Sequence, residues 1–212
     1  MVEEPVIFTP DNEPYLGLRS LMILDTTIVA SLKLNSDVAT YTHRNNLTRL
    51  QKAATQIIPQ GFNLVLSIRE LIRQGHLFSA AVLVRPLIER TGIISYLVEN
   101  PSALNEWEDG WRHGKRPSLK KMLKNMHGEG EDEGLQDTID TFNHLVHGDP
   151  MSAEFNLVNL DNDALGYGVG RVTNNNNLCD LLCTLTLSWL VVLSAMASKA
   201  FPDAVKTKRT TL

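Results

Sequence analysis

The chain has 212 residues, of which 43% are hydrophobic and 21% are charged, and its formal net charge at pH 7 is -4. This length suits one domain, or a small pair, and the composition is ordinary for a soluble globular protein with a real core. The negative charge argues against a protein that coats nucleic acid non-specifically, although it leaves room for a local basic patch. Two cysteines do not make a disulfide framework, which fits a reducing compartment.

The first 34 residues predict an extended arm followed by a helix. Residues 1–14 are rich in proline and lack the basic start and apolar core of a signal peptide. From Tyr15 to about Leu34 the apolar residues recur with helical spacing, and Asp25 lies within their stripe. Because a lone charge on an apolar face usually lies at its edge, we expect Asp25 at the rim of the core.

The second helix has the most regular apolar pattern in the chain. Its apolar and small residues recur in steps of three and four, at Leu47, Leu50, Ala54, Ile57, Gly61, Leu64, Ile68 and Leu71. This seam predicts a helix that packs lengthwise against its neighbours. Pro59 lies inside it, so we expect a kink or a break near Ile58, and Gly75 is placed to end the helix.

The stretch from His76 to Asn100 predicts a central helix that is apolar on nearly every side. Between Leu77 and Val98 its ionisable side chains, apart from Tyr96, are Arg85, Glu89 and Arg90. Arg85 and Glu89 are four residues apart and therefore share a face. Burying such a pair is costly unless it is hydrogen-bonded, so it is either a structural pair that fixes helix register or part of a functional site.

A strongly basic segment follows this helix. Trp107 and Trp111 lie four residues apart in a short predicted helix, and we expect them to clamp it onto the core. The basic residues after them are Arg112, Lys115, Arg116, Lys120, Lys121 and Lys124. An acidic run at residues 129–133 comes next, so the charges either neutralise one another on a solvated surface or form a patch that attracts phosphate.

The last third of the chain predicts two more helices, with a small β-hairpin between them. Residues 135–146 have helical apolar spacing, and loose alternation around residues 161–163 predicts a hairpin flap near residues 154–172. The final helix contains the uncharged run 181–197, roughly 17 residues, which is at the short limit for crossing a bilayer. We expect a core helix, no membrane, a cytoplasmic protein and a mobile tail at 203–212.

These elements predict an all-α fold, an antiparallel helical bundle with one β-hairpin insertion, in a single domain over residues 1–212. His144 and His147, three residues apart, lie on adjoining parts of one helix face. The chain lacks the HExxH and CxxC spacings of metal sites and the GxSxG of a nucleophilic serine. We therefore expect neither a bound metal nor a cofactor.

The pairing of RPLIER (residues 85–90) with FNHLVHGDP (residues 142–150) resembles an uncharacterised prokaryotic helical family. That family is loosely similar to the HEPN (higher eukaryotes and prokaryotes nucleotide-binding) superfamily. The resemblance covers roughly residues 60 to 150. It implies a helical bundle, often a dimer, and in many members a metal-independent ribonuclease of a toxin or defence system. The HEPN motif is an arginine, a polar residue and, one helical turn later, a histidine. Asn143 and His147 match the last two, whereas Phe142 occupies the arginine position.

Arg85 could replace the missing arginine if its helix packs against the helix of His147. His147 would then act as general acid or base at the ribose 2′-hydroxyl, and Arg85 would hold the scissile phosphate. Glu89 would orient Arg85, Asn143 or His144 would assist, and the basic residues 112–124 would attract RNA. The structural alternative for His147 is a helix-end histidine favoured by the helix dipole.

Three functions follow from these patterns. The first is a HEPN-like ribonuclease, or a degenerate descendant of one, that forms a homodimer and acts on RNA. The second is a non-catalytic helical module that dimerises or binds a partner protein. The third is a metal-dependent hydrolase, for which Asp149, Glu89 and His113 would have to join the two histidines as ligands.

Overall fold

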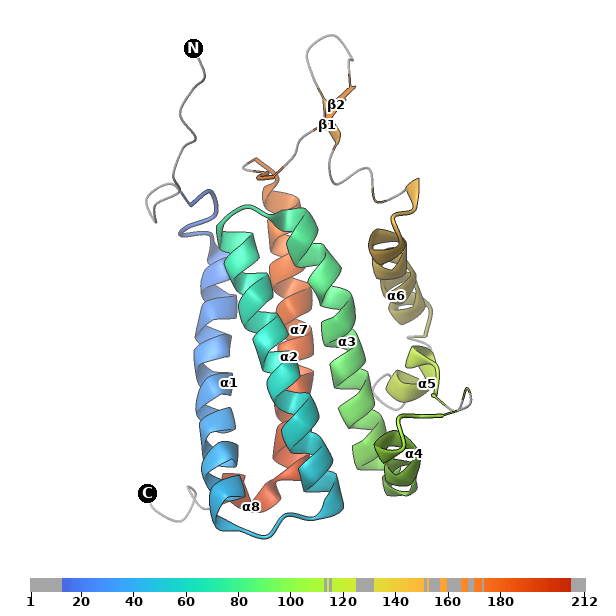
Figure 1. The fold of residues 1–212 in the computed structure, drawn as a ribbon. Coiled ribbons are helices and arrows are strands. Elements are labelled where there is room, and N and C mark those ends of the chain that lie inside the picture. Colours follow the sequence, from blue (N-terminus) through green and yellow to red (C-terminus); the bar gives the residue numbers. More distant parts are fainter. Residues whose placement is uncertain are drawn as a thin grey trace, which may run out of the picture.

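The structure is a computed structural model, and it describes residues 13–112, 114, 116–124, 132–150, 152, 157–159, 165–167, 170–172 and 174–206. The long helices of its main body are α1 (Arg19–Arg44), α2 (Arg49–Arg73), α3 (Leu77–Glu99) and α7 (Asn176–Ala200) (Figure 1). The shorter helices are the 3-10 helix η2 (Pro101–Ala103), α4 (Leu104–Glu108), α5 (Leu119–Leu123), α6 (Asp132–His147) and α8 (Pro202–Lys206). The strands are β1 (Leu157–Asn159) and β2 (Leu165–Tyr167). The prediction of an all-α helical bundle is confirmed.

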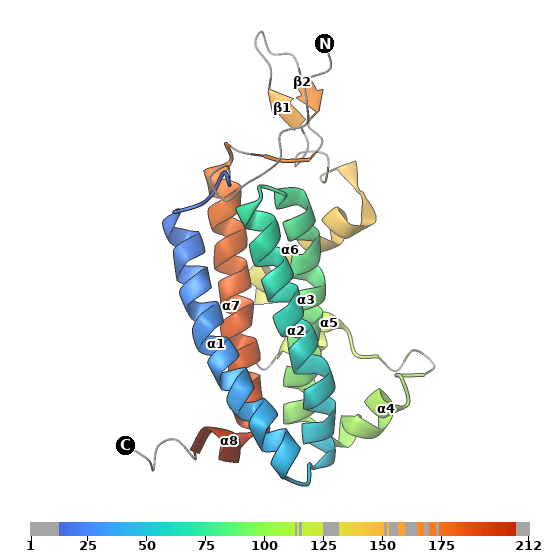
Figure 2. The ribbon, with the colours of Figure 1, turned by 60° about the vertical axis from the view of Figure 1, so that its left-hand side comes forward.

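The direction of α7 departs from the predicted antiparallel arrangement. The hydroxyl of Tyr15, just before α1, accepts a hydrogen bond of 3.2 Å from the amide of Asn175, just before α7. At the opposite end, Gln51 in the first turn of α2 donates from Nε2 to the carbonyl of Ala200, the last residue of α7, at 3.3 Å. α7 therefore runs in the same direction as α1, while α2 runs against both (Figure 1 and Figure 2).

α3 also begins at the end where α1 and α7 begin, since the amide of Val172 donates to the carbonyl of Gly75 at 2.8 Å. A strictly antiparallel bundle was therefore the wrong prediction. The physical reason is the long connection between α3 and α7, in which α6 runs back along α3 (Figure 1). Such a crossover lets consecutive long helices of a bundle run parallel.

α3 is the surrounded helix that its composition predicts. It contacts α2 and α7 on one side and α5 and α6 on the other (Figure 1). Ala81, Leu87 and Ile93, on different sides of α3, are buried. Its neighbours approach closely at Gly92, where a Cβ atom would lie 2.8 Å from Cδ1 of Leu119 in α5.

The apolar seam of α2 packs against the core with its residues buried or partly buried, but the break expected near Ile58 is absent. α2 is continuous from Arg49 to Arg73 with Pro59 inside it, and Pro59 itself is exposed. The proline thus removes one amide from the solvent side of the helix, while the core side stays packed. At Gly61 a Cβ atom would lie 2.5 Å from Cδ2 of Leu193 in α7, so the Leu193 side chain packs directly on the α2 backbone there.

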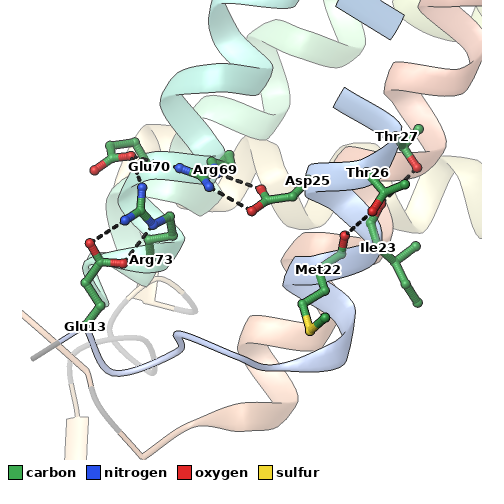
Figure 3. Close-up of polar contacts among 9 residues, drawn as sticks. All are labelled: Glu13, Met22, Ile23, Asp25, Thr26, Thr27, Arg69, Glu70 and Arg73. Carbon is green, nitrogen blue, oxygen red and sulfur yellow. Dashed lines mark hydrogen bonds and ion pairs between the residues drawn. The ribbon is translucent and has the colours of Figure 1, made fainter. Parts of the chain in front are cut away.

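Ion pairs join α1 to α2 near the start of α1 (Figure 3). Arg69 binds both carboxylate oxygens of Asp25, each at 2.7 Å, and Arg73 donates from Nε to Glu13 at 2.7 Å. Glu70 lies within 3.3 Å of both guanidinium groups. Asp25 is only partly exposed, as expected of a rim carboxylate. We call these five residues the paired cluster.

The prediction of a β-hairpin insertion near residues 154–172 is wrong. In the described part of that segment, strand structure is limited to β1 and β2, of three residues each, paired with Val158 opposite Gly166. Arg171 and Val172, expected in the second strand, instead bind the loop between α2 and α3: Arg171 donates from Nε to the carbonyl of Gln74 at 2.6 Å. Much of the remaining segment lies outside the described residues.

An extended arm and a mobile tail were predicted at the two ends of the chain. Most of the arm expected at residues 1–14 lies outside the described residues, as do residues 207–212 of the expected tail. Residues 203–206, also expected in that tail, are helical in α8.

By length and composition alone, α7 could cross a membrane, and no other helix in the described part of the chain meets that test. It packs against α1, α2 and α3, with Leu190 and Leu193 fully buried, whereas Leu181 and Val191 are exposed. The core helix of a soluble protein passes the same test, so the expectations of no membrane and of a cytoplasmic protein stay predictions.

Candidate functional site

Arg85 of α3 contacts α6 directly. Its Nε donates a hydrogen bond of 2.7 Å to Oδ1 of Asn143, which fixes the plane of the guanidinium group. Nη1 lies 3.2 Å from Oε1 of Glu89, which makes an ion pair. The geometry is not that of a hydrogen bond, so the buried Nη1 has no hydrogen-bond partner in the described part of the chain. The side chain of Arg85 is 16% exposed, so this cation is largely removed from water.

Glu89 is shared by three guanidinium groups. Besides Arg85, Oε2 of Glu89 lies 3.6 Å from Nη2 of Arg116 and 3.8 Å from Nη1 of Arg90. Arg90 also donates from Nε to Oε1 of Gln60 at 2.7 Å. We call Arg85, Glu89, Arg90 and Arg116 the cation-rich cluster. One carboxylate faces three cations, and this imbalance favours the approach of an anion.

α6 brings Asn143 and His147 to the same side of one helix, since they are four residues apart. Asn143 is partly buried at Arg85, whereas His147, in the last turn, is exposed, and its ring has no hydrogen-bond partner among the described residues. Phe142, which stands where the HEPN motif has arginine, is buried in the core. The guanidinium that reaches Asn143 therefore comes from α3.

His144 lies beside this face. Its Nδ1 is 2.6 Å from Oδ2 of Asp149, a carboxylate just beyond the end of α6. The carboxylate holds the ring in one orientation, and both side chains are roughly half exposed. This contact occupies Nδ1 and not the other ring nitrogen, Nε2.

The structure brings Arg85, Glu89 and Asn143 together, and Arg116 joins them at Glu89. The other described residues of the predicted basic patch are spread over the surface. Arg112 donates from Nε to the carbonyl of Asp109 at 3.2 Å. Lys120, Lys121 and Lys124 are exposed on α5 and at its end. Lys115 lies outside the described residues, as does His113, which a metal site would need.

Trp107 and Trp111 pack onto α3, as predicted for a clamp. Trp111 is buried, and its ring meets the edge of Tyr96 at 6.5 Å between centroids. The guanidinium carbon of Arg116 lies 5.9 Å from the centroid of Trp111, within cation–π range. Sequence reasoning missed this contact, because spacing along the chain does not place Arg116 over an indole five residues earlier.

Possible metal ligands and the two cysteines are the other residues that could carry catalytic chemistry. The described part of the chain contains no group of three or more His, Cys, Asp and Glu side chains that could hold a metal ion. Cys179 and Cys183 are buried in α7. The hydrogen bond with Cys183 and burial raise the pKa of the Cys179 thiol, which disfavours the thiolate needed of a nucleophile.

No protein-family profile, curated protein or solved structure shows a significant match to this chain. The likeness to the HEPN superfamily therefore stays a prediction, based on the short motifs quoted above.

Proposed function

We propose that this chain is a HEPN-like, metal-independent ribonuclease of a toxin or defence system, or a descendant that retains the RNA site. The observation that carries the proposal is the bond between Arg85 and Asn143. It puts a largely buried guanidinium group on the α6 face that also carries His147. A buried cation is costly, and an anion that approaches it offsets part of that cost.

Arg85 is suited to bind a phosphodiester. Asn143 occupies its Nε and Glu89 faces its Nη1, while Nη2 has no partner among the described residues. A guanidinium that is held on two sides does not have to reorganise as negative charge grows on a phosphate. Arg90 and Arg116 add positive charge beside it and attract the RNA backbone.

His147 is suited to the proton transfers. As general base it takes the proton of the ribose 2′-hydroxyl, and the 2′ oxygen then forms a bond to phosphorus. The bond from phosphorus to the 5′ oxygen breaks, and that oxygen receives a proton from water or from His144. The products are a 2′,3′-cyclic phosphate and a 5′-hydroxyl end.

The test is cleavage of single-stranded RNA by the full chain in excess EDTA. We expect 2′,3′-cyclic phosphate ends from the wild type, and a loss of about 100-fold or more in rate for His147→Ala and for Arg85→Ala. The matched control is His43→Ala, because His43 is another exposed histidine in the last turn of a helix. Equal rates for the His43 and His147 variants would contradict the proposal, as would activity that EDTA abolishes.

A non-catalytic dimerisation module is the second candidate, and the outer face of α1 favours it. Met22 and Val29 are 60% and 69% exposed, and Val29 and Leu66 line a groove of 340 Å³ between α1 and α2. Such a face suits a second copy of the chain. Light scattering should show a dimer that Val29→Glu disrupts and that Ala30→Glu, on another side of α1, does not. A wild-type monomer at high concentration would reject this candidate.

A further inference from the structure

A pocket of 210 Å³ lies beside the cation-rich cluster, between α3, α4 and the segment that follows α4. The described residues that line it are Arg90, Ile93, Trp107, Gly110, Trp111 and Arg116. Two guanidinium groups and two indoles therefore converge on one cavity. Cations select an anion, while flat aromatic and guanidinium surfaces select a planar ring.

The cations of this pocket keep hydrogen-bond donors for a ligand. Their distances to Glu89, 3.8 Å from Arg90 and 3.6 Å from Arg116, are beyond hydrogen-bonding range. Gln60 occupies only Nε of Arg90. Half of the Arg116 side chain is exposed, so a ligand can reach it from solvent.

The aromatic wall of the pocket is fixed by its surroundings. Trp111 has φ 52°, a left-handed conformation that is unfavourable for a bulky residue, and it follows Gly110 at φ 73°. Tyr96 on one side and Arg116 on another hold the indole of Trp111. A strained residue that is held in this way beside a cavity points to a function for that cavity.

We propose that this pocket binds one nucleotide unit of a single-stranded RNA. The base stacks against the indole of Trp107 and against the Arg116 guanidinium, which itself lies over Trp111, and Arg90 and Arg116 bind the phosphate of that unit. This inference rests on the proposed ribonuclease function, of which it names the base-binding subsite. Glu89 contacts Arg85 as well as Arg90 and Arg116, so the bound nucleotide lies next to the phosphate that Arg85 holds.

The experiment is titration of the wild-type chain with adenosine 5′-monophosphate, ribose 5-phosphate and inorganic phosphate, followed by indole fluorescence and by calorimetry. We expect adenosine 5′-monophosphate to quench the fluorescence and to bind at least tenfold more tightly than the two ligands without a base. Arg116→Gln should weaken this binding about tenfold. Arg112→Gln is the matched control, because Arg112 is exposed nearby and does not line the pocket.

Three results would overturn the inference: equal affinity for ribose 5-phosphate, no binding at millimolar nucleotide, or equal losses in the Arg112 and Arg116 variants. Trp107→Leu gives a second check, and unchanged affinity in a variant with a wild-type circular dichroism spectrum would also overturn it. These ligands contain no phosphodiester, so binding is measured independently of cleavage. Binding without RNA cleavage would reject the ribonuclease and keep the pocket, while cleavage without binding would reject the pocket alone.

Discussion

The paired cluster and the cation-rich cluster are built from the same kinds of side chain, arginines and carboxylates, but in opposite proportions. In the paired cluster, three carboxylates serve two arginines, and both Arg69 and Arg73 make hydrogen bonds to carboxylates at two or more nitrogens (Figure 3). In the cation-rich cluster, a single carboxylate serves three arginines at 3.2 to 3.8 Å.

The difference distinguishes a structural role from the binding role that we propose. A guanidinium whose donors are all bound to carboxylates stabilises the contact between two helices and has little left for a ligand. A guanidinium that shares its carboxylate with two others keeps donors and excess charge, which an anion can neutralise. Matched substitutions in the two clusters test whether they behave as differently as their geometry indicates.

The largest effect is expected from equivalent arginine substitutions in the two clusters. Arg85→Gln should lower the rate of metal-free RNA cleavage by about 100-fold to 1,000-fold, because the phosphate loses its preorganised donor. Arg69→Gln should leave that rate unchanged and instead lower the free energy of unfolding by about 1 kcal/mol, since Asp25 is partly exposed. Cleavage assays and urea unfolding check both. A reversed pattern would mean that the roles of the clusters are misassigned.

Two glycines with positive φ, one near each cluster, allow the two regions to be compared at the backbone as well. Gly75 has φ 80° near the paired cluster, and a Cβ atom there would lie 2.9 Å from the carbonyl oxygen of Val172. Gly110 has φ 73° beside the pocket, and among the described residues no atom other than those of its chain neighbours lies within 4 Å of that position. Gly75→Ala should therefore cost more in unfolding free energy, about 2–3 kcal/mol, than Gly110→Ala, about 1 kcal/mol. Equal losses in thermal unfolding would show that the close contact at Gly75 does not matter.

Removing one carboxylate from each cluster should give a smaller difference. Glu89→Gln leaves three cations without their shared partner, so we expect several-fold tighter binding of a short RNA at low salt and a modest fall in melting temperature. Glu70→Gln should change RNA binding by less than twofold, because Glu13 and Asp25 still pair with Arg73 and Arg69. Fluorescence anisotropy at two salt concentrations measures the affinities. Weaker binding by Glu89→Gln would indicate that Glu89 acts only by orienting Arg85.

The smallest effect concerns Tyr15, which joins the starts of α1 and α7. Burial raises the pKa of Tyr15 above its ordinary value, partly opposed by the hydrogen bond from the amide of Asn175. The folded state thus favours the protonated phenol, and this contribution is complete below pH ~10 and is lost as the pH rises further. Tyr15→Phe should cost about 1 kcal/mol at pH 7 and make the decline in stability above pH ~10 shallower. Denaturant titrations at pH 7 and at several pH values above pH ~10 check this. An equally steep decline of the unfolding free energy with pH in the variant and the wild type would contradict it.

Much of the bundle could be predicted from periodicity, because burial imposes it directly. The surrounded position of α3 follows from its uniformly apolar composition, and the packed seam of α2 follows from its heptad spacing. The direction of α7 could not be predicted, since an apolar helix packs as well parallel as antiparallel. Only the course of residues 100–175 decides it. The hairpin prediction failed because alternation at Arg171 and Val172 does not reveal that they bind the loop after α2.

The candidate site was predictable in part. A lone ion pair inside an apolar helix indicated Arg85 and Glu89, and the motif-like spacing indicated Asn143, which the structure does place on Arg85. The sharing of Glu89 with Arg116 could not be predicted, because it depends on how the segment after α4 folds back onto α3. The pocket between Arg90 and the indoles was missed for the same reason.

The most direct test of the account is the rate of metal-free RNA cleavage by a chain that carries both Arg85→Gln and His147→Ala. Residues that act on one phosphodiester as a unit are not additive. We therefore predict that the double variant is no more than a few-fold slower than the slower of the two single variants. A rate equal to the product of the two separate losses would show that Arg85 and His147 act independently, and would contradict a single site built by α3 and α6.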